Sequence, residues 1–399
     1  MGPASPRPKP ELRTMPQLAT HVQQFTESVI REMTRLARQY DAINLAQGFP
    51  DFPCPAEIKE AARRAIADDV NQYAITWGAK SLRDAICEKA RWYNGIDADP
   101  EANVTVCCGA TEAMISSLMA IVNPGDEVVV FEPFYENYGP DAVLSHATPR
   151  FVRLAEPDWT FDEAELAAAF NDRTKAIIIN TPNNPTGKVF SREELECVAA
   201  LCRKWDVIAV TDEIYEHILY DGCAHVSIAA LDGMADRTIT VNAASKTYAV
   251  TGWRVGWAVA SARITASLRK VHDFLTVGSP HPLQEAIAQA LKLPRSYYEQ
   301  LASDYTVRRD LMHGMLESVG FACYVPKGAY YMMTNTRKLT QEEDVAFARR
   351  LVKEIGVAVV PGSSFYRDPA DGADKVRFCF AKQRATLAAA AARLERVKG

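Results

Sequence analysis

Short runs of apolar, mostly β-branched residues alternate with longer amphipathic stretches from about residue 100 onward. Each short run has the length and composition of a buried strand, and the stretch 192–205 has the apolar spacing of a helix with one buried face. Because strands separated by helices are joined by right-handed crossovers, this alternation predicts an α/β fold with a mostly parallel sheet. The predicted strands span residues 103–108, 127–131, 176–181, 207–212 and 238–242.

The pattern changes after Pro294 to a long, Arg-rich helical segment followed by short strands and a final Ala-rich helix. This order predicts a smaller α+β domain. The N-terminal stretch 23–40 is expected to pack on that domain as a helix. The predicted elements are a helix over 297–319, strands over 329–333, 357–360 and 376–380, and a helix over 386–397.

These patterns divide the chain into three parts. The Pro-rich start has no apolar segment of the kind found in signal sequences, so it is expected to be disordered. The 399 residues are enough for two domains. We expect a disordered lead over 1–20, a large domain over 51–290, and a small domain formed by 21–50 together with 291–399.

Composition and charge narrow the class of protein. Hydrophobic residues make up 48% of the chain and charged residues 24%, which is ordinary for a globular enzyme. A net charge of -5 argues against nucleic acid as a partner, and no apolar run approaches the ~20 residues of a membrane span. Nine cysteines without repeated Cys-x-x-Cys spacing indicate reduced thiols and a cytoplasmic location, and the seven scattered histidines predict no metal site.

Four short motifs stand out, and the residues Asn184, Asp212 and Lys246 of three of them follow predicted strands, which is where ligands bind in parallel α/β sheets. Each motif fits one part of pyridoxal 5'-phosphate: an amine for its aldehyde, a carboxylate for its ring nitrogen, donors for its phenolic oxygen, and a guanidinium for its phosphate. Together they point to this cofactor. The motifs are Asn-Asn-Pro-Thr-Gly (183–187), Thr-Asp-Glu-Ile-Tyr (211–215), Ala-Ala-Ser-Lys-Thr (243–247) and Thr-Gly-Trp-Arg-Val-Gly-Trp (251–257).

A phosphate seat is predicted at residues 109–114, which follow a strand and open a helix. The free N–H groups of a first helical turn and the positive end of the helix dipole can bind a phosphate, and Thr111 adds a hydroxyl. The alternative is an ordinary turn with a threonine cap. Arg254, whose guanidinium can bind the same phosphate through two hydrogen bonds, favours the seat.

Asp212 ends an apolar run, where an unpaired carboxylate is costly. A protonated pyridine nitrogen would be its cationic partner, and this ion pair would keep the ring an electron sink. The alternative is an aspartate that caps a helix. The nearby Asn184 and Tyr215, both suited to bond the phenolic oxygen, favour the cofactor.

Lys246 lies among small and hydroxylated residues, which leave space for an aldehyde. A surface lysine is the alternative. In the cofactor interpretation the lysine holds the aldehyde as an imine (Schiff base), and the freed amine later moves the proton between the substrate Cα and the cofactor.

Two further residues are candidates. Tyr135 follows a predicted strand and either stacks on the cofactor ring or packs in the core. Arg377 is a single charge inside an apolar strand pattern, which is costly unless it meets an anion such as the α-carboxylate of a substrate. An internal salt bridge is the alternative for Arg377.

These motifs, in this order, resemble those of class I/II aminotransferases of the pyridoxal-phosphate fold type I, the aspartate aminotransferase superfamily. The resemblance covers roughly residues 25–395. Within the family the chain is most similar to the branch of kynurenine, glutamine and methionine aminotransferases, through segments 44–52, 180–190 and 376–380. It implies a large domain with a mostly parallel seven-stranded sheet flanked by helices, and a smaller α+β domain.

The resemblance also implies a role for each site residue. Lys246, Asp212 and Tyr215 are implied as catalytic, and Tyr73 is implied to reach the phosphate of a neighbouring subunit, which implies a homodimer. Family members pass an amino group from an amino acid to a 2-oxo acid by a ping-pong mechanism. The implied cofactor contacts are Ala110, Thr111, Tyr135, Asn184, Asp212, Tyr215, Ser245, Lys246, Arg254 and Tyr73, and the implied substrate contacts are Gly48, Asn184 and Arg377.

Two positions depart from the family pattern. Ala243 stands where relatives usually carry a serine that touches the phosphate, so the phosphate is either held more loosely or held by Ser245 instead. His281 lies in segment 276–284, which shapes the substrate pocket in relatives, and the sequence assigns it no role. Both departures concern the identity of the substrate and leave the cofactor assignment in place.

The leading hypothesis is an aminotransferase for an aromatic or sulfur-containing L-amino acid, with kynurenine, methionine, glutamine and phenylalanine as candidates. The alternative enzyme is a cysteine-conjugate C–S β-lyase, because the same Cα carbanion expels a good β-leaving group. A non-catalytic binding protein would be expected to lack the lysine or the aspartate, and both are present.

Overall fold

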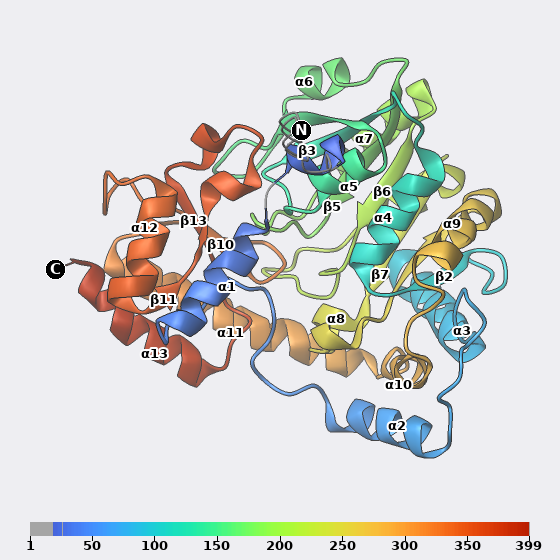
Figure 1. Cartoon of the computed structure of the whole chain (residues 1–399), viewed down its shortest axis with the longest axis horizontal. Coiled ribbons are helices and arrows are strands. Elements are labelled where there is room, and N and C mark those ends of the chain that lie inside the picture. The colour runs from blue at the N-terminus through green and yellow to red at the C-terminus, as the bar shows by residue number, and fades with distance from the viewer. Residues whose placement is uncertain (1–18, 26, 399) are drawn as a thin grey trace, which may run out of the picture.

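A seven-stranded sheet forms the centre of the larger part of the computed structural model, which describes residues 19–25 and 27–398 (Figure 1). Its strand order is β2-β8-β7-β6-β5-β3-β4. Strand β8 is antiparallel to both neighbours, and all other neighbouring pairs are parallel, which confirms the predicted sheet. The strands are β2 (Val104–Cys107), β3 (Glu127–Glu132), β4 (Thr148–Arg153), β5 (Thr174–Asn180), β6 (Ile208–Asp212), β7 (Thr238–Ala243) and β8 (Gly256–Ala260).

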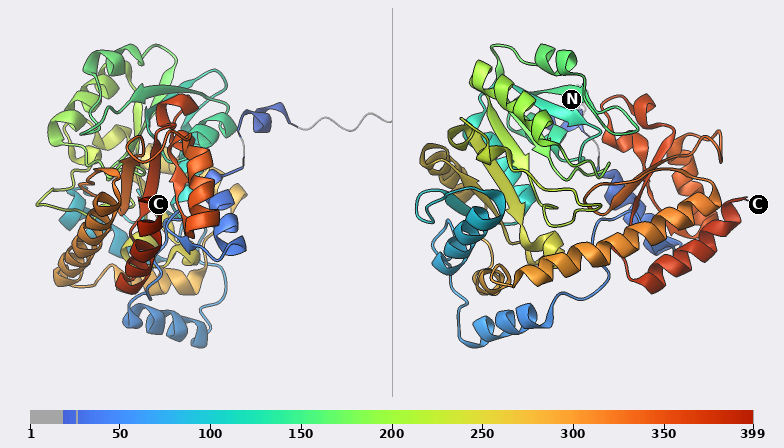
Figure 2. Two further views of the ribbon diagram at one scale, coloured as in Figure 1. Left: turned by 90° about the vertical axis from the view of Figure 1, so that its left-hand side faces the viewer. Right: turned by 180° about the vertical axis from the view of Figure 1, so that it is seen from behind.

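Helices cover both faces of this sheet, with α4 and α9 packed together on one face and α7 on the other (Figures 1 and 2). The central strands are buried on both sides, which explains their unbroken apolar runs. The helices of this part are α2 (Ala56–Ala67), α3 (Lys80–Lys89), α4 (Ala110–Ile121), α5 (Tyr138–Leu144), α6 (Glu163–Ala168), α7 (Arg192–Trp205), α8 (Ala244–Thr247), α9 (Ala262–Leu275) and α10 (His281–Ala290).

Two strands of the sheet were not predicted from the sequence. Strand β4 lies at the sheet edge and is largely solvent-facing, so it lacks an apolar run. Strand β8 is a Gly-Trp-Ala-Val-Ala segment that begins inside the motif 251–257, with a single β-branched residue. In both cases pairing with a neighbouring strand, rather than local propensity, makes the segment extended.

A four-stranded antiparallel sheet of order β12-β13-β10-β9 forms the centre of the second part. Helix α1 packs on β11 and β12, and β1 pairs in parallel with β11, so the N-terminal segment lies against the C-terminal part. The elements are α1 (Val29–Gln39), β1 (Ile43–Asn44), α11 (Arg295–Val319), β9 (Ala322–Tyr324), β10 (Tyr331–Asn335), α12 (Asp344–Arg350), β11 (Val357–Ala358), β12 (Val360–Pro361), β13 (Lys375–Cys379) and α13 (Arg384–Leu394).

The N-terminal end of the chain matches the sequence prediction only in part. The expected helix over 23–40 begins at Val29, because Ser28 caps it by accepting a hydrogen bond from the Arg31 N–H at 3.3 Å. Residues 1–18 of the expected lead lie outside the described residues.

The expected domain boundaries stay a prediction. The long helix α11 extends from beside the first part into the second, so no single residue separates the two parts (Figure 2). Among the described helices, none has the length and apolar character needed to cross a membrane.

Candidate active site

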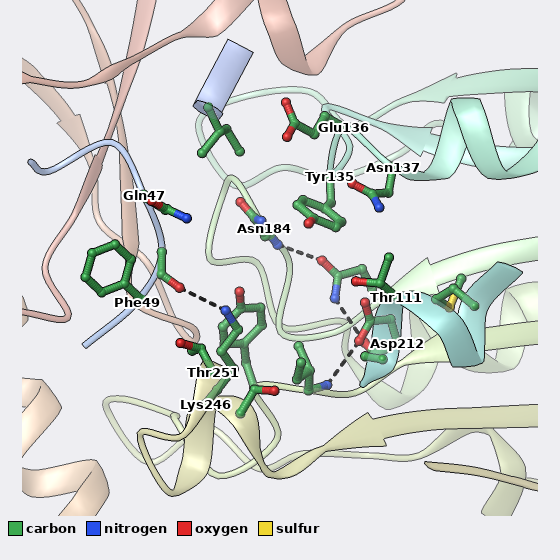
Figure 3. Close-up of a pocket in the computed structure, with 18 of the residues that line it drawn as sticks. Gln47, Phe49, Thr111, Tyr135, Glu136, Asn137, Asn184, Asp212, Lys246 and Thr251 are labelled. Atoms are coloured by element: carbon green, nitrogen blue, oxygen red, sulfur yellow. Dashed lines mark hydrogen bonds between the residues drawn. The ribbon is translucent and has the colours of Figure 1, made fainter. Parts of the chain in front are cut away.

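A pocket of about 320 Å³ lies between the two sheets (Figure 3). Its wall is formed by the carboxyl ends of β5 and β6 from the larger sheet, by β10 and β13 from the smaller sheet, and by the start of α4. It therefore lies where parallel α/β sheets bind ligands. Tyr73 is the predicted site residue that lies outside it. The predicted residues that line the pocket are Gly48, Ala110, Thr111, Tyr135, Asn184, Asp212, Tyr215, Ser245, Lys246, Arg254 and Arg377.

At the start of α4 the backbone comes close to the guanidinium of Arg254. Gly109 has a φ of +83°, and a Cβ at this position would lie 2.3 Å from Nη2 of Arg254. A Cβ at Gly256 would lie 2.6 Å from the backbone nitrogen of Ala110. Glycine at 109 thus lets the Arg254 guanidinium lie against the start of α4, and glycine at 256 lets β8 pack against the same backbone. A helix start combined with a cation is a fitting seat for a phosphate.

Buried polar residues behind the helix hold this seat in place. The Glu112 carboxylate accepts a hydrogen bond from the Cys108 N–H at 2.9 Å and lies 3.0 Å from Nδ1 of His272. The other ring nitrogen of His272 lies 2.8 Å from the carbonyl oxygen of Thr76. Sequence reasoning missed this network, because Glu112 and His272 are 160 residues apart.

Asp212 is the last residue of β6 and is only 6% exposed. Its Oδ2 accepts a hydrogen bond from the Tyr138 hydroxyl at 2.8 Å, and its Oδ1 accepts one from the Ile214 N–H at 3.2 Å. Burial raises the pKa of Asp212 to about 6, although both hydrogen bonds oppose that rise. Because no cation is bonded to it within the described chain, the carboxylate is suited to a cationic ligand group.

Lys246 lies in α8, directly after β7, and its amine points into the pocket (Figure 3). The Nζ donates a hydrogen bond to the carbonyl oxygen of Gly48 at 2.9 Å. Burial lowers the pKa of Lys246 to about 8. A lysine with a lowered pKa has a larger neutral fraction near pH 7, which makes it a better nucleophile and base.

Arg377 is completely buried on β13. Its Nη1 donates to Oδ1 of Asn184 at 2.6 Å and its Nη2 donates to the carbonyl oxygen of Ala46 at 2.6 Å, whereas its Nε has no partner. Both bonded acceptors are neutral. In the described part of the chain the guanidinium thus lacks the internal salt bridge that was the alternative, and it can bind a carboxylate.

Aromatic side chains surround these charged groups. The hydroxyls of Tyr215 and Tyr331 are 3.0 Å apart, and the Tyr330 hydroxyl donates to the carbonyl oxygen of Gly48 at 2.9 Å. Burial raises the pKa of Tyr215 well above its ordinary value, so it stays a neutral donor. Tyr135 faces the pocket between Glu136 and Asn184 (Figure 3). Asn184 keeps its amide NH₂ as a donor, since its Oδ1 is already bonded.

The two positions that depart from the family pattern lie in different places. Ala243 ends β7 outside the pocket wall, while Ser245 lines the pocket. His281 begins α10, and its Nδ1 lies 3.0 Å from the carbonyl oxygen of Gln72. His281 therefore contacts the segment that carries Tyr73, which is 86% exposed.

Several pocket residues were not found from the sequence. Tyr138 and Asp141 come from the short helix α5, Asn180 from the end of β5, Tyr331 from β10, and Gln47 from the loop after β1. The single usable signal was the position of Asn180 at a strand end. The others reach the pocket because separate parts of the chain pack around it, which no local pattern records.

The fold and this pocket define a class of enzyme that binds an anionic cofactor and an amino acid. The family model for aminotransferase class I and II matches residues 40–394, and the chain belongs to this family. The protein is an aminotransferase of the pyridoxal-phosphate-dependent type, so the resemblance and the fold class expected from the sequence are confirmed.

Individual relatives have different substrates. Kynurenine–oxoglutarate transaminase 1 of Homo sapiens is 38% identical over 92% of this chain and 95% of its own length. The methionine aminotransferase of Escherichia coli is 36% identical over 96% of this chain and 97% of its own. The structure of N-succinyldiaminopimelate aminotransferase from Mycobacterium tuberculosis superposes with a TM-score of 0.93 at 36% identity and covers 96% of this chain and all of that one.

These comparisons establish the reaction class but not the substrate. Aminotransferases act on amino acids and 2-oxo acids, so substrates of these two kinds follow from the family. All three relatives named here are aminotransferases, and they give no support to the alternative of a C–S lyase.

Proposed function

We propose that this enzyme moves the amino group of an aromatic or sulfur-containing L-amino acid to a 2-oxo acid, with pyridoxal 5'-phosphate held in the pocket described above. The observation that carries the proposal is the buried guanidinium of Arg377, which faces the same cavity as Lys246 and Asp212 and has only neutral partners among the described residues. A buried cation of this kind is suited to the α-carboxylate that every amino acid and 2-oxo acid carries.

The pocket residues fit each part of the cofactor. The start of α4, with Ala110 and Thr111, would hold the phosphate together with Arg254 and Ser245. Asp212 would pair with the ring nitrogen, and Asn184 and Tyr215 would donate to the phenolic oxygen. Tyr135 would pack on the ring face. Two observations support this fit. A Cβ at Gly109 would fill the space beside Arg254, and the buried Asp212 carboxylate is bonded to no cation in the described part of the chain.

When bound, pyridoxal 5'-phosphate supplies an aldehyde that captures amines covalently and a protonated ring that withdraws electrons from the substrate Cα. Lys246 has a pKa lowered by burial to about 8, so its amine can take the proton from Cα and return one later. Arg377 and Asn184 would orient the carboxylate, with Gly48 beside it. Through its hydrogen bond to the phenolic oxygen, Tyr215 would keep the cofactor ring in position next to Lys246.

The donor class is supported by the pocket wall and by the relatives. Phe49, Tyr135, Tyr331 and Ile30 provide apolar surface for a large side chain. The names of two relatives include kynurenine and methionine. The name of the third relative includes N-succinyldiaminopimelate, which has carboxylates beyond the α-carboxylate. A further cation would suit such a carboxylate, and Arg31 is a candidate because it also lines the pocket.

The test is a panel of donors with the purified protein and pyridoxal 5'-phosphate. Kynurenine, methionine, glutamine, phenylalanine and N-succinyldiaminopimelate are each mixed with the enzyme, and the half-reaction is followed by the absorbance change of the bound cofactor. Turnover with 2-oxoglutarate and pyruvate follows. We expect the aromatic and sulfur-containing donors to react fastest. Fast reaction with N-succinyldiaminopimelate alone, or with none of the donors, would reject the proposed substrate class.

A homodimer in which Tyr73 reaches the partner's phosphate belongs to the same proposal. Tyr73 is 86% exposed in the single chain, and Phe274 is 92% exposed on a neighbouring segment. The two segments are in contact, since His272 bonds to Thr76 and His281 to Gln72. An exposed apolar patch of this kind supports a protein partner.

Two variants separate the contributions of these two aromatic residues. Phe274→Asp should halve the mass measured by light scattering. Tyr73→Phe should keep the dimer mass and weaken cofactor binding. A monomeric wild-type protein, or unchanged cofactor affinity in Tyr73→Phe, would reject this arrangement.

A further inference from the structure

Asp141 is a buried carboxyl in the pocket for which the mechanism above has no use. It lies on α5, lines the pocket and is 5% exposed. Its Oδ2 has no hydrogen-bond partner among residues 19–25 and 27–398. Since an unpaired buried carboxylate is costly, this residue needs a physical explanation.

Its surroundings join it to Asp212. Tyr138 lies one turn earlier on the same face of α5 and donates its hydroxyl to Asp212 at 2.8 Å. The negative charge of Asp212 raises the pKa of Asp141, and a charge on Asp141 would in turn raise the pKa values of Tyr138 and Tyr135. Two carboxyls and two phenols therefore form one cluster at this end of the pocket.

Other charged groups near α5 are engaged elsewhere. Helix α5 packs against α4, β3, β4 and the short helix η1 (Thr20–Gln24). Among the described residues of these elements, the charged side chains have partners away from Asp141. Glu112 bonds to His272, Glu127 pairs with Arg173 and Arg150, Glu132 accepts from the Arg367 N–H, and Arg153 pairs with Asp371.

Two neighbouring buried carboxyls cannot both ionise cheaply. Asp212 has two hydrogen-bond donors that stabilise its anion, whereas Oδ2 of Asp141 has none among the described residues. Burial and the charge of Asp212 raise the pKa of Asp141 to about 8, whereas burial raises that of Asp212 only to about 6. Near pH 7 Asp212 therefore carries the charge and Asp141 carries the proton.

We propose, building on the function proposed above, that Asp141 is a positioning residue that acts through Asp212. It stands beside Asp212 as a proton-bearing carboxyl, so that this end of the pocket presents one negative charge, not two, to a protonated pyridine nitrogen. The protonated carboxyl also offers the pocket a hydrogen-bond donor at an oxygen that has no partner among the described residues, which an apolar residue of the same size could not provide.

Infrared spectroscopy of the full-length protein without cofactor tests the protonation. The spectrum of wild type minus that of Asp141→Asn should contain the carbonyl band of a protonated carboxylic acid at pH 7, and the band should disappear near pH 8. In Asp212→Asn the midpoint should move to lower pH, because the repelling charge is gone. The exposed control Asp172→Asn should leave the band in place. Absence of the band at pH 7, or an unmoved midpoint in Asp212→Asn, would overturn the proposal.

A spectral titration of the cofactor-loaded enzyme tests the action through Asp212. A protonated Asp141 adds no charge beside that of Asp212, whereas a second carboxylate would hold protons on the bound cofactor more strongly. Where the midpoint of the cofactor's absorbance change lies below about pH 8, it should therefore be the same in wild type and in Asp141→Asn. A midpoint that is higher in wild type by about one pH unit would show a second charge and overturn the role of Asp141 alone. Failure of wild type to bind pyridoxal 5'-phosphate would instead overturn the proposed function.

Discussion

Arg377→Met should separate substrate binding from fold stability. Methionine fills a similar volume but removes the guanidinium, whose two hydrogen bonds go to neutral acceptors, Asn184 and Ala46. If Arg377 serves the substrate carboxylate, the variant should lose catalytic efficiency for amino acids and 2-oxo acids alike. The fold should be barely affected, because a buried charge without an ionic partner contributes little to stability.

The structure sets the size of both effects. Loss of a two-pronged, charge-assisted contact with a carboxylate costs about 3 kcal/mol, which corresponds to a fall in kcat/KM of about 150-fold. Breaking a buried ion pair would cost 3–5 kcal/mol of unfolding free energy in general, so about that much loss would be expected if Arg377 had an internal partner. Here the relief of a buried charge offsets two lost hydrogen bonds, and we expect a change within about 1 kcal/mol.

The assay combines steady-state kinetics for both half-reactions with urea unfolding of the cofactor-free protein. Arg309→Met is the matched control, since Arg309 is also buried but pairs with Asp221 at 2.7 and 3.0 Å. The control should lose stability and keep its KM values. Unchanged kinetics together with a large loss of stability in Arg377→Met would refute the assignment of Arg377 to the substrate.

Four further predictions concern other pocket residues. Lys246→Ala should abolish turnover and the borohydride fixation of the cofactor, and fixation that persists by mass spectrometry would point to another lysine. Asp212 ionises near pH 4 when unfolded and near pH 6 when folded, so the folded state binds an extra proton over that range and loses stability as the pH rises. Asp212→Asn should therefore make the cofactor-free protein more stable at pH 7, by up to about 3 kcal/mol in urea unfolding, while turnover collapses; a less stable variant would contradict this. Gly109→Ala should weaken cofactor affinity measured by fluorescence, because its Cβ would collide with Arg254 at 2.3 Å and its φ is +83°; equal affinity would exclude the phosphate seat. Arg31→Ala should raise the KM for 2-oxoglutarate more than that for pyruvate, and equal changes would show that Arg31 does not meet the distal carboxylate.

The alternation of apolar runs with amphipathic stretches was enough to predict the class of fold. The inner parallel strands are buried on both faces, so their sequences are continuous Val and Ile runs that few other structures tolerate. The edge strand β4 lacks that constraint, while β8 is buried but too short and glycine-initiated to stand out in the sequence, and the extended conformation of both depends on the neighbours they pair with. Strand propensity alone was therefore insufficient for these two.

The residues that follow strands β5, β6 and β7 could be found because parallel strands bring their carboxyl ends to one edge. Asn184, Asp212 and Lys246 are of this kind, and all three line the pocket. The sequence also supplied the chemical type of each group. It did not show that Arg377 lacks an ionic partner, which depends on residues distant along the chain.

Asp141 marks the limit of what the sequence alone decides. On a short helix an aspartate is usually solvated, and nothing nearby in the chain indicates that this one is buried beside Asp212, 71 residues later. Local sequence determines which groups the enzyme possesses, because propensity and burial pattern act over a few residues. Tertiary packing decides which of those groups lose water and which charges face each other, and these two conditions set their protonation and hence their chemistry.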